Sequence, residues 1–342
     1  MTFLTGPLPL IPQTGGDRGT GGNSGAPAVV ALGGGHGLSS SLSALRLLTT
    51  DLTAVVTVAD DGGSSGRLRR ELDVLPPGDL RMALSALCDD TDWGRTWRDV
   101  MQHRFTSRPG VEGSLDNHAL GNLLIVTLWE LLGDPVAGLQ WAGALLGARG
   151  QVLPMSTQPL TIEGDVLRQT GDGEWLETVS GQARLAAAGA RSRVSEIRLT
   201  PVDAPACPEA LAAIERADWV ILGPGSWYTS VLPHLMLPEL RSALCRTRAK
   251  RCLTMNLSNE TKETAGMSAV DHLAAISRYA PDFRVDAVLA DPSVIDDLPG
   301  FEAAVREMGG RVVFGKVGAA TGGPIHDPLR LATAYHDIFG EN

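Results

Sequence analysis

The stretch from Ala28 to Arg70, AVVALGGGHGLSSSLSALRLLTTDLTAVVTVADDGGSSGRLRR, predicts the class of fold. Its first apolar run, Ala28–Leu32, has the length and composition of a buried strand and ends in a glycine-rich turn over residues 33–37. Leucines at helical spacing follow the turn, and a second apolar run, Leu52–Ala59, predicts another strand. A strand, a helix and a strand in this order are typical of a parallel α/β sheet.

The glycine turn is predicted to bind a phosphate group. Glycine has no side chain, so the backbone can turn sharply there and approach a ligand closely. The first turn of the following helix, which contains Ser39, offers free N–H groups and the positive end of the helix dipole. The second strand leads to Asp60 and Asp61 at the same edge of the sheet, where open α/β sheets bind their ligands.

The rest of the chain continues the α/β alternation with one interruption. Helices are expected over 80–87, 91–105, 118–132, 136–146, 208–216, 268–279 and 328–339, and strands over 218–222, 250–256, 286–290 and 311–317. We expect the helix over 91–105 to be exposed or to cover the site like a lid. Around residues 151–200, runs flanking the turn Thr170–Gly173 predict an inserted antiparallel hairpin region, a candidate dimerisation surface. Residues 28–342 are therefore expected to form a single domain.

The composition excludes some classes of partner. The chain has 342 residues and a net charge of −10, from 29 basic and 39 acidic residues, which argues against binding nucleic acid or an anionic membrane. Its four cysteines form no C-x-x-C pair, which indicates a reducing compartment. Residues 1–27 are rich in Gly, Pro and Thr and are expected to be a disordered leader. The most apolar segment, Leu120–Leu132, is too short to span a bilayer, so we expect a cytoplasmic protein without membrane insertion.

Polar residues elsewhere are further candidates for the site. Asp79 follows a Pro-Pro-Gly turn and is expected to cap the next helix, and Arg81 in the first turn of that helix hints at an anionic partner. His118 and Asn122 lie four residues apart on one face of an apolar helix, where polar side chains are costly unless paired. Asn122 is therefore either a site residue or a satisfied core amide. A second strand–glycine loop corner is expected at residues 223–226.

Three common motifs do not fit the chain. The dinucleotide fingerprint fails because its third glycine would fall at Leu38, and the Walker pattern fails because no Gly-Lys-Ser/Thr follows the loop. Residues 62–66 satisfy G-x-S-x-G, the nucleophile elbow of serine hydrolases. Two carboxylates directly before this loop fit a hydrolase poorly. Asp60 and Asp61 are left with three interpretations: Mg²⁺ ligands, partners of sugar hydroxyls, or a cap for the following turn. His36 could donate to a phosphate or have no role.

Several motifs together resemble a known family. They lie at residues 29–38, 56–69 (VTVADDGGSSGRLR), 76–81 (PPGDLR), 118–124 (HALGNLL), 222–231 (LGPGSWYTSV) and 256–272. In this order they are similar to the gluconeogenesis-factor family, whose YvcK-like members are a bacterial branch of the superfamily of 2-phospho-L-lactate transferase (CofD-like proteins). The chain departs from that pattern at His36, where Thr is usual, at Met82, where Asn is common, and at Trp227, where Leu is usual.

The resemblance implies a Rossmann-like fold that binds a nucleotide. YvcK-like members have no assigned catalysis, bind UDP-sugars, notably UDP-N-acetylglucosamine, and support growth on gluconeogenic carbon sources, cell-wall synthesis and cell shape. In the transferase branch, phospholactate passes from a guanylyl-linked donor to a deazaflavin alcohol with Mg²⁺, and Asp60 or Asp61 matches an aspartate of that site. The alternative function is therefore a Mg-dependent transferase of that type.

These inferences give the expected site and partners. The expected ligand-binding residues are Gly34, Gly35, His36, Gly37, Ser39, Asp60, Asp61, Ser64, Arg67, Asp79, Arg81, His118, Asn122, Gly223, Gly225, Ser226, Asn256, Glu263 and Thr264. Asp60 and Asp61 are also the candidate Mg²⁺ ligands and catalytic residues. No cofactor is expected to be required beyond the nucleotide-sugar ligand. The expected partners are proteins of cell-wall synthesis and a second copy of the chain in a dimer.

Overall fold

A seven-stranded parallel sheet forms the centre of the protein in the computed structural model, which describes residues 25–111, 113–170, 173–189, 192–258, 264, 266–320 and 323–340. The strand order is β10-β9-β8-β7-β1-β2-β3. The strands are β1 (Val29–Gly33), β2 (Leu52–Val56), β3 (Gln151–Pro154), β7 (Trp219–Leu222), β8 (Lys250–Thr254), β9 (Ala287–Ala290) and β10 (Arg311–Phe314). β1, β2, β7 and β9 are buried along their whole length, which explains why they are continuous apolar runs.

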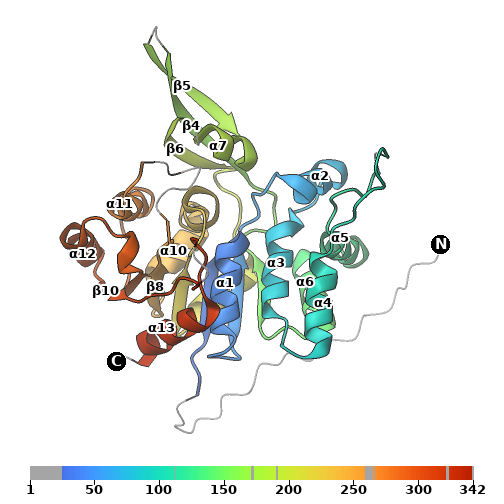
Figure 1. Cartoon of the computed structure of the whole chain (residues 1–342), viewed down its shortest axis with the longest axis horizontal. Helices are drawn as coiled ribbons and strands as arrows, with labels where there is room; N and C mark the ends of the chain where they lie inside the picture. The colour runs from blue at the N-terminus through green and yellow to red at the C-terminus, as the bar shows by residue number, and fades with distance from the viewer. Residues whose placement is uncertain are drawn as a thin grey trace.

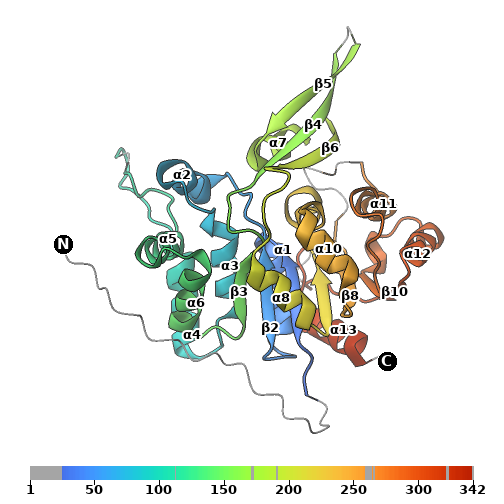
Figure 2. The same cartoon turned by 180° about the vertical axis from the view of Figure 1, so that it is seen from behind.

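Helices cover both faces of this sheet. Figure 1 shows α1 (Gly35–Leu45), α3 (Pro77–Leu87) and α13 (Pro328–Gly340) in front of it, and Figure 2 shows α8 (Pro208–Arg216) and α10 (Pro238–Arg246) over the other face. The remaining helices are α2 (Gly63–Leu72), α4 (Asp92–Gln102), α5 (Leu120–Leu132), α6 (Pro135–Leu146), α7 (Gln182–Gly189), α9 (Pro233–Met236), α11 (Ala269–Tyr279) and α12 (Leu298–Glu307), with short turns at Trp227–Val231 and Pro292–Val294. The predicted Rossmann-like α/β fold is confirmed.

A second, antiparallel sheet projects from the main body (Figure 1, top). Its strands, in the order β5-β4-β6, are β4 (Thr161–Thr170), β5 (Gly173–Ser180) and β6 (Arg193–Thr200), and α7 packs on it. The hairpin of β4 and β5 is as predicted, although residues 171–172 of its turn lie outside the described part. β3, by contrast, pairs with β2 in the main sheet, so the antiparallel region begins only after it.

Helices begin earlier than the sequence pattern indicates. α1 begins at Gly35, inside the glycine run, and α2 begins at Gly63, so the Gly-Ser stretch is a first helical turn. α3 begins at Pro77, because proline has no N–H to lose at this position. The expectation that Asp79 caps this helix is therefore wrong: Asp79 lies inside its first turn.

α4 lies on the flank of the molecule. It packs against α3, α5 and α6, and its Trp93 indole donates a hydrogen bond to the carbonyl oxygen of Leu145. Figure 1 shows it away from the three-stranded sheet. Of the two expectations for this helix, it is the exposed helix that the structure shows, and not a lid over the site. Arg104, which lies beyond the end of α4, reaches the pocket described below.

Further expectations concern the N-terminal leader, Glu263 and the absence of membrane-spanning segments. Of the expected leader, residues 1–24 lie outside the described part, as does Glu263. Within the described residues, every helix is too short or too polar to cross a membrane.

Candidate functional site

Two glycine-rich turns lie against each other at the carboxyl ends of β1 and β7. These strands are neighbours in the sheet, and the turns that follow them are residues 33–37 and 223–226. A Cβ atom on Gly37 would overlap the carbonyl oxygen of Pro224, and one on Gly34 would lie 2.6 Å from the Thr57 hydroxyl oxygen. A side chain does not fit at either position, because backbone atoms of the facing turn occupy the space at Gly37 and the side-chain oxygens of Asp79 and Thr57 occupy it at Gly34.

The N-terminus of α1 lies at this contact, and its N-cap residue, Gly34, has no side chain that could cap the helix. Gly34 precedes the helix in an extended conformation, and no acidic residue lies in the first turn. His36 is exposed there, and Ser39 is half-buried one turn in. Free N–H groups and the positive end of the dipole favour an anion at such a helix end.

The turn after β7 is held by the side chain of Asn256. Its amide oxygen accepts from the Gly225 N–H at 2.9 Å, and its amide nitrogen donates to the Gly225 carbonyl oxygen at 2.8 Å. Asn256 therefore shapes the turn through its backbone, although the sequence suggested direct ligand contact. The Ser226 hydroxyl accepts a hydrogen bond of 2.7 Å from Thr229. Thr264, also expected at the site, is buried.

Asp79 places a carboxyl group beside the start of α1. It accepts hydrogen bonds from the Thr57 hydroxyl, at 3.3 Å, and from the backbone N–H of Gly35. Burial raises the pKa of Asp79 to about 7, and the negative charge of Asp60 adds to the shift. Burial also raises the pKa of Asp60, although hydrogen bonds from the Gly62 N–H and the Ser65 side chain act in the opposite direction. The charge of Asp60 thus acts on Asp79, and the charge of Asp61 acts on Asp60.

Asp61 points to a different part of the molecule. Its carboxylate accepts a hydrogen bond of 2.9 Å from the N–H of Ala183, in the first turn of α7. Gly181 lies directly against the same carboxylate. Asp61 therefore caps the helix of the projecting sheet, a role that the sequence did not suggest. The carboxylate that accepts from the following turn is that of Asp60, from the Gly62 N–H at 2.9 Å. In the described part of the chain, no group of three or more His, Cys, Asp or Glu side chains converges as a metal site.

Ser64, in the first turn of α2, brings His118 and Asn122 together. Its hydroxyl lies 3.0 Å from His118 Nδ1 and accepts a hydrogen bond of 3.0 Å from Asn122 Nδ2. The Ser64 proton therefore points to His118 Nδ1, which requires a neutral imidazole. Burial lowers the pKa of His118, as do the positive charges of Arg67 and Arg104. Among the described residues no carboxylate is hydrogen-bonded to His118, so a Ser-His-acid triad is incomplete.

Arg81 is a buried cation with unmet hydrogen-bonding capacity. Its side chain is 4% exposed, and neither Nε nor Nη1 has a hydrogen-bond partner in the described part of the chain. Burial and the charge of Arg104 lower its pKa to about 10. The charges of Asp79 and Asp60 act in the opposite direction and partly compensate that of Arg81, but its two buried donors without acceptors remain costly.

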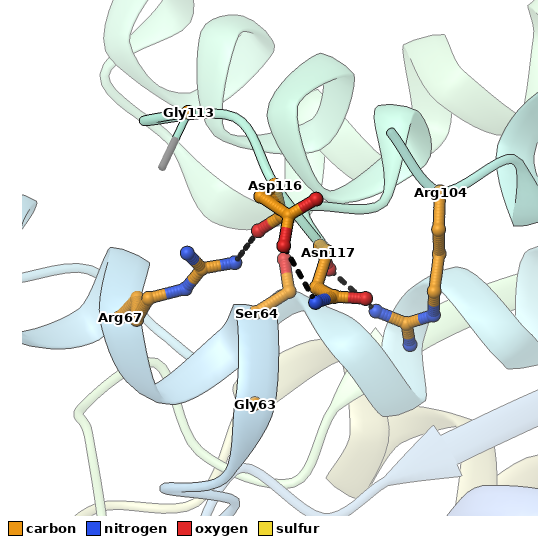
Figure 3. A pocket seen from close by; sticks show the side chains of 7 residues that line it. All are labelled: Gly63, Ser64, Arg67, Arg104, Gly113, Asp116 and Asn117. Atoms are coloured by element: carbon orange, nitrogen blue, oxygen red, sulfur yellow. Dashed lines mark hydrogen bonds between the residues drawn. The ribbon is translucent and has the colours of Figure 1, made fainter. Parts of the chain in front are cut away.

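A pocket of about 470 Å³ lies beside α2 (Figure 3). Its lining residues are Gly63, Ser64, Arg67, Arg104, Gly113, Asp116 and Asn117. Arg67 donates to the Asp116 carbonyl oxygen at 2.5 Å, and Arg104 donates to the Asn117 carbonyl oxygen at 2.9 Å (Figure 3). The sequence had indicated only Ser64 and Arg67 among these residues, so the other five were missed. One available signal was the Asp116-Asn117 pair directly before His118, since Asn tolerates the left-handed φ of 60° found at Asn117.

Tyr335 is a supporting residue that the sequence did not reveal. Its buried hydroxyl lies 3.0 Å from Ser41 of α1 and 2.9 Å from Thr254 of β8. Ser41 donates in turn to the carbonyl oxygen of Gly223 at 3.1 Å. Because Ser41 uses its proton there, the Tyr335 hydroxyl donates to Ser41 and accepts from Thr254. This network joins both glycine turns to the C-terminal helix.

The fold and these turns define a Rossmann-like α/β protein with paired glycine turns at the carboxyl edge of its sheet. The chain belongs to the CofD family: the profile described as 2-phospho-L-lactate transferase CofD matches residues 29–303.

Relatives of known name are similar over most of their length. The chain is 39% identical to the gluconeogenesis factor of Halalkalibacterium halodurans, covering 79% of each protein, and 35% identical to that of Bacillus subtilis, covering 79% of this chain and 80% of the relative. A Mycobacterium tuberculosis protein that carries this name provisionally is 48% identical over 313 residues, 91% of this chain and 90% of the relative. A crystal structure of a UPF0052 family member from Bacillus halodurans superposes with a TM-score of 0.77 at 33% identity, covering 90% of this chain and 98% of that one.

Proposed function

We propose that the protein is a nucleotide-sugar-binding regulator whose ligand is a UDP-sugar, in particular UDP-N-acetylglucosamine. The observation that carries this proposal is the contact between the two glycine turns at the N-terminus of α1, where Gly34 provides no side-chain cap and the Asp79 carboxyl group reaches the Gly35 N–H. We call this site, formed by residues 33–37 and 223–226, the glycine corner. A diphosphate suits it, because backbone N–H groups there can reach the oxygens of the diphosphate.

The ligand would lie across the corner. Its diphosphate would contact residues 34–37 and face the turn at Gly225 and Ser226. Asn122 has an amide oxygen without a hydrogen-bond partner in the described part of the chain, so it can accept from a sugar hydroxyl. Asp60 offers a second acceptor nearby.

The biological role follows from the relatives. Two of them carry the name gluconeogenesis factor, which supports a role in growth on gluconeogenic carbon sources. We extend the proposal to cell-wall synthesis and cell shape, with proteins of that machinery as partners, a dimer as the working form and the cytoplasm as its location. A UDP-sugar ligand suits this role, since it would link carbon supply to envelope precursors.

Calorimetry with UDP-N-acetylglucosamine tests the proposal. We expect saturable binding to the wild-type protein and loss of binding in Gly37→Ala, because the new methyl group pushes the Pro224 turn away. Gly143→Ala is the matched control, since a Cβ there meets only ordinary van der Waals contacts, the nearest at 3.7 Å. Absence of binding to every UDP-sugar at millimolar concentration overturns the proposal.

A Mg-dependent transferase is the second candidate, favoured by the family match and by the Asp60–Asp79 pair. Two partly buried carboxyl groups of raised pKa suit a divalent cation, which would relieve their repulsion and bridge to phosphate oxygens. Asp60 and Asp79 would hold Mg²⁺, which would neutralise charge on the transferring phosphoryl group. Asp61 suits this role less, because it is bonded to α7.

Turnover assays separate the two candidates. The protein would be incubated with Mg²⁺, a guanylyl-linked phospholactate and a deazaflavin alcohol, and product followed by chromatography. Turnover that is lost in Asp60→Asn and Asp79→Asn but kept in Asp61→Asn supports the transferase. Absence of product with wild-type protein that still binds UDP-N-acetylglucosamine supports the regulator.

A further inference from the structure

Positive charge gathers around Ser64 in a chain whose net charge is −10. Arg67 and Arg104 line the pocket beside α2, and both lower the pKa of His118, which is bonded to Ser64. Arg104 also acts on the buried Arg81. Guanidinium groups repel one another, so such a grouping is unfavourable unless an anion lies among them.

The acidic residue in the pocket wall is already engaged. The Asp116 carboxylate accepts hydrogen bonds from the Ser107 N–H, at 2.7 Å, and from the Asn117 side chain, at 3.0 Å. Arg67 and Arg104 contact backbone carbonyl oxygens of this segment, which are neutral (Figure 3). The positive charge of the two guanidinium groups is therefore left without a carboxylate partner among the described residues.

Arg81 and Asn122 carry unsatisfied polar atoms next to two residues of the pocket wall, Arg104 and Ser64. Arg81 is more than nine-tenths buried and has two nitrogen atoms without hydrogen-bond partners in the described part of the chain. Asn122 is bonded to Ser64 in the pocket wall, and its amide oxygen lacks a partner by the same criterion. Neither residue lines the pocket itself, so the proposal depends on Arg67, Arg104 and the helix end, and these atoms only make the interior next to Ser64 polar.

The N-terminus of α2 adds free donors on the same side. Gly62 caps this helix without a side chain, and its first turn contains no acidic residue. Gly63 and Ser64 lie both in that turn and in the pocket wall. A Cβ on Gly63 would meet no atom within 4 Å, so a ligand can approach this backbone freely.

We propose that the pocket between the N-terminus of α2 and Arg104 binds a phosphate-sized anion, as a subsite separate from the glycine corner at α1. The group it takes is a phosphoryl or carboxylate group. Its source is either a small anionic metabolite or an anionic part of the same ligand that occupies the corner. The subsite does not depend on the identity of the nucleotide.

Inorganic phosphate is the probe, titrated calorimetrically into the full chain at constant ionic strength. We expect saturable binding that weakens about tenfold or more in Arg104→Gln and in Arg67→Gln, because each removes a charged hydrogen-bond donor. Arg216→Gln, at the end of α8, makes the same change of charge on the far face and is expected to leave binding unchanged. Circular dichroism verifies that each variant is folded.

The His118 imidazole reports where the phosphate binds. Arg67 and Arg104 hold its pKa down while Glu71 acts in the opposite direction. Phosphate in the pocket offsets the two arginines, so saturation should raise the pKa of His118, measured by NMR titration. Phosphate affinity that is equal in wild type, Arg67→Gln and Arg104→Gln overturns the proposal, as does a His118 pKa that phosphate leaves unmoved.

Competition with UDP-N-acetylglucosamine identifies the source of the anion. If UDP-N-acetylglucosamine displaces the phosphate whose binding is sensitive to Arg104→Gln, the nucleotide ligand itself fills the pocket. Simultaneous binding of both means that the pocket serves a second, small anionic ligand. Binding of UDP-N-acetylglucosamine without any phosphate binding overturns the subsite and leaves the proposed function standing.

Discussion

The carboxyl group of Asp79 accepts a hydrogen bond from the backbone N–H of Gly35, the first residue of α1. The protein thus places an ionisable acid of its own at the helix end that is best suited to an anion. Burial and the nearby Asp60 raise the pKa of Asp79 to about 7, so its charge changes near neutral pH. Protonation of Asp79 near neutral pH therefore removes a negative charge from the site where a phosphate would bind.

The first prediction concerns the pH dependence of stability. Because the pKa of Asp79 rises from 3.8 to about 7 on folding, the folded state binds the proton more tightly. The resulting stabilisation is fully present below the unfolded pKa and is lost as pH rises through the folded pKa. Urea unfolding between pH 3 and 8, a range of about five units that brackets both values, should show a smaller decline in stability with pH for Asp79→Asn than for wild type. Asp99→Asn, exposed on α4, serves as the control, and equal slopes in all three proteins would contradict the prediction.

The second prediction concerns Tyr335. Tyr335→Phe removes the hydroxyl that donates to Ser41 and accepts from Thr254, and the loss of these two buried hydrogen bonds should reduce the free energy of unfolding by about 2 kcal/mol. Ser41 also holds the Gly223 carbonyl, so the variant should bind UDP-N-acetylglucosamine more weakly at a temperature where it is fully folded. Thr333→Ala, on the exposed side of the same helix, should change neither quantity. Full affinity in Tyr335→Phe would mean that the network only supports the fold.

The third prediction concerns Asp61. Asp61→Ala removes the hydrogen bond to the Ala183 N–H and should cost α7 about 1 kcal/mol of local stability, as for other lost N-caps. Hydrogen exchange should therefore quicken in α7 while the central strands stay protected. Asp61→Asn keeps an acceptor at this position and should restore much of the protection. Uniformly faster exchange over the whole chain would show that Asp61 stabilises the entire domain.

The sequence predicted the parts of the molecule that depend on local pattern. Buried parallel strands appear as apolar runs, and the two glycine turns stand out because each follows such a run. The helix starts at Gly35 and Gly63 were missed, because glycine has a low intrinsic helix propensity and only tertiary contacts favour it there. One of these contacts, between Gly37 and Pro224, joins residues far apart in the chain.

Two of the missed residues, Arg104 and Tyr335, have no local signal in the sequence. Arg104 lies after an exposed helix in the sequence, and its place in the pocket depends on the backbone of Asn117. Tyr335 lies 294 residues from Ser41, and nothing in the pattern of α13 distinguishes it from a core aromatic. The proximity of Asp79 to Asp60 likewise results from how α3 packs, which the sequence does not reveal. The sequence therefore pointed to Asp60 and Asp61, which are adjacent in the chain.

The attachment of the projecting hairpin has a mechanical consequence. Asp61, just before α2, is bonded to Ala183, and Arg69, near the end of the same helix, donates to the Thr161 hydroxyl at 2.9 Å. These two hydrogen bonds lie at the base of the projecting sheet, where β4 begins. β4 has 10 residues and, at ~3.3 Å per residue, is about 33 Å long. A tilt of α2 by about 5° would carry the tip of such a strand by about 3 Å. The hairpin is thus a lever arm whose short end lies at the anion pocket, and it converts a small movement beside a ligand into a displacement on the outer surface.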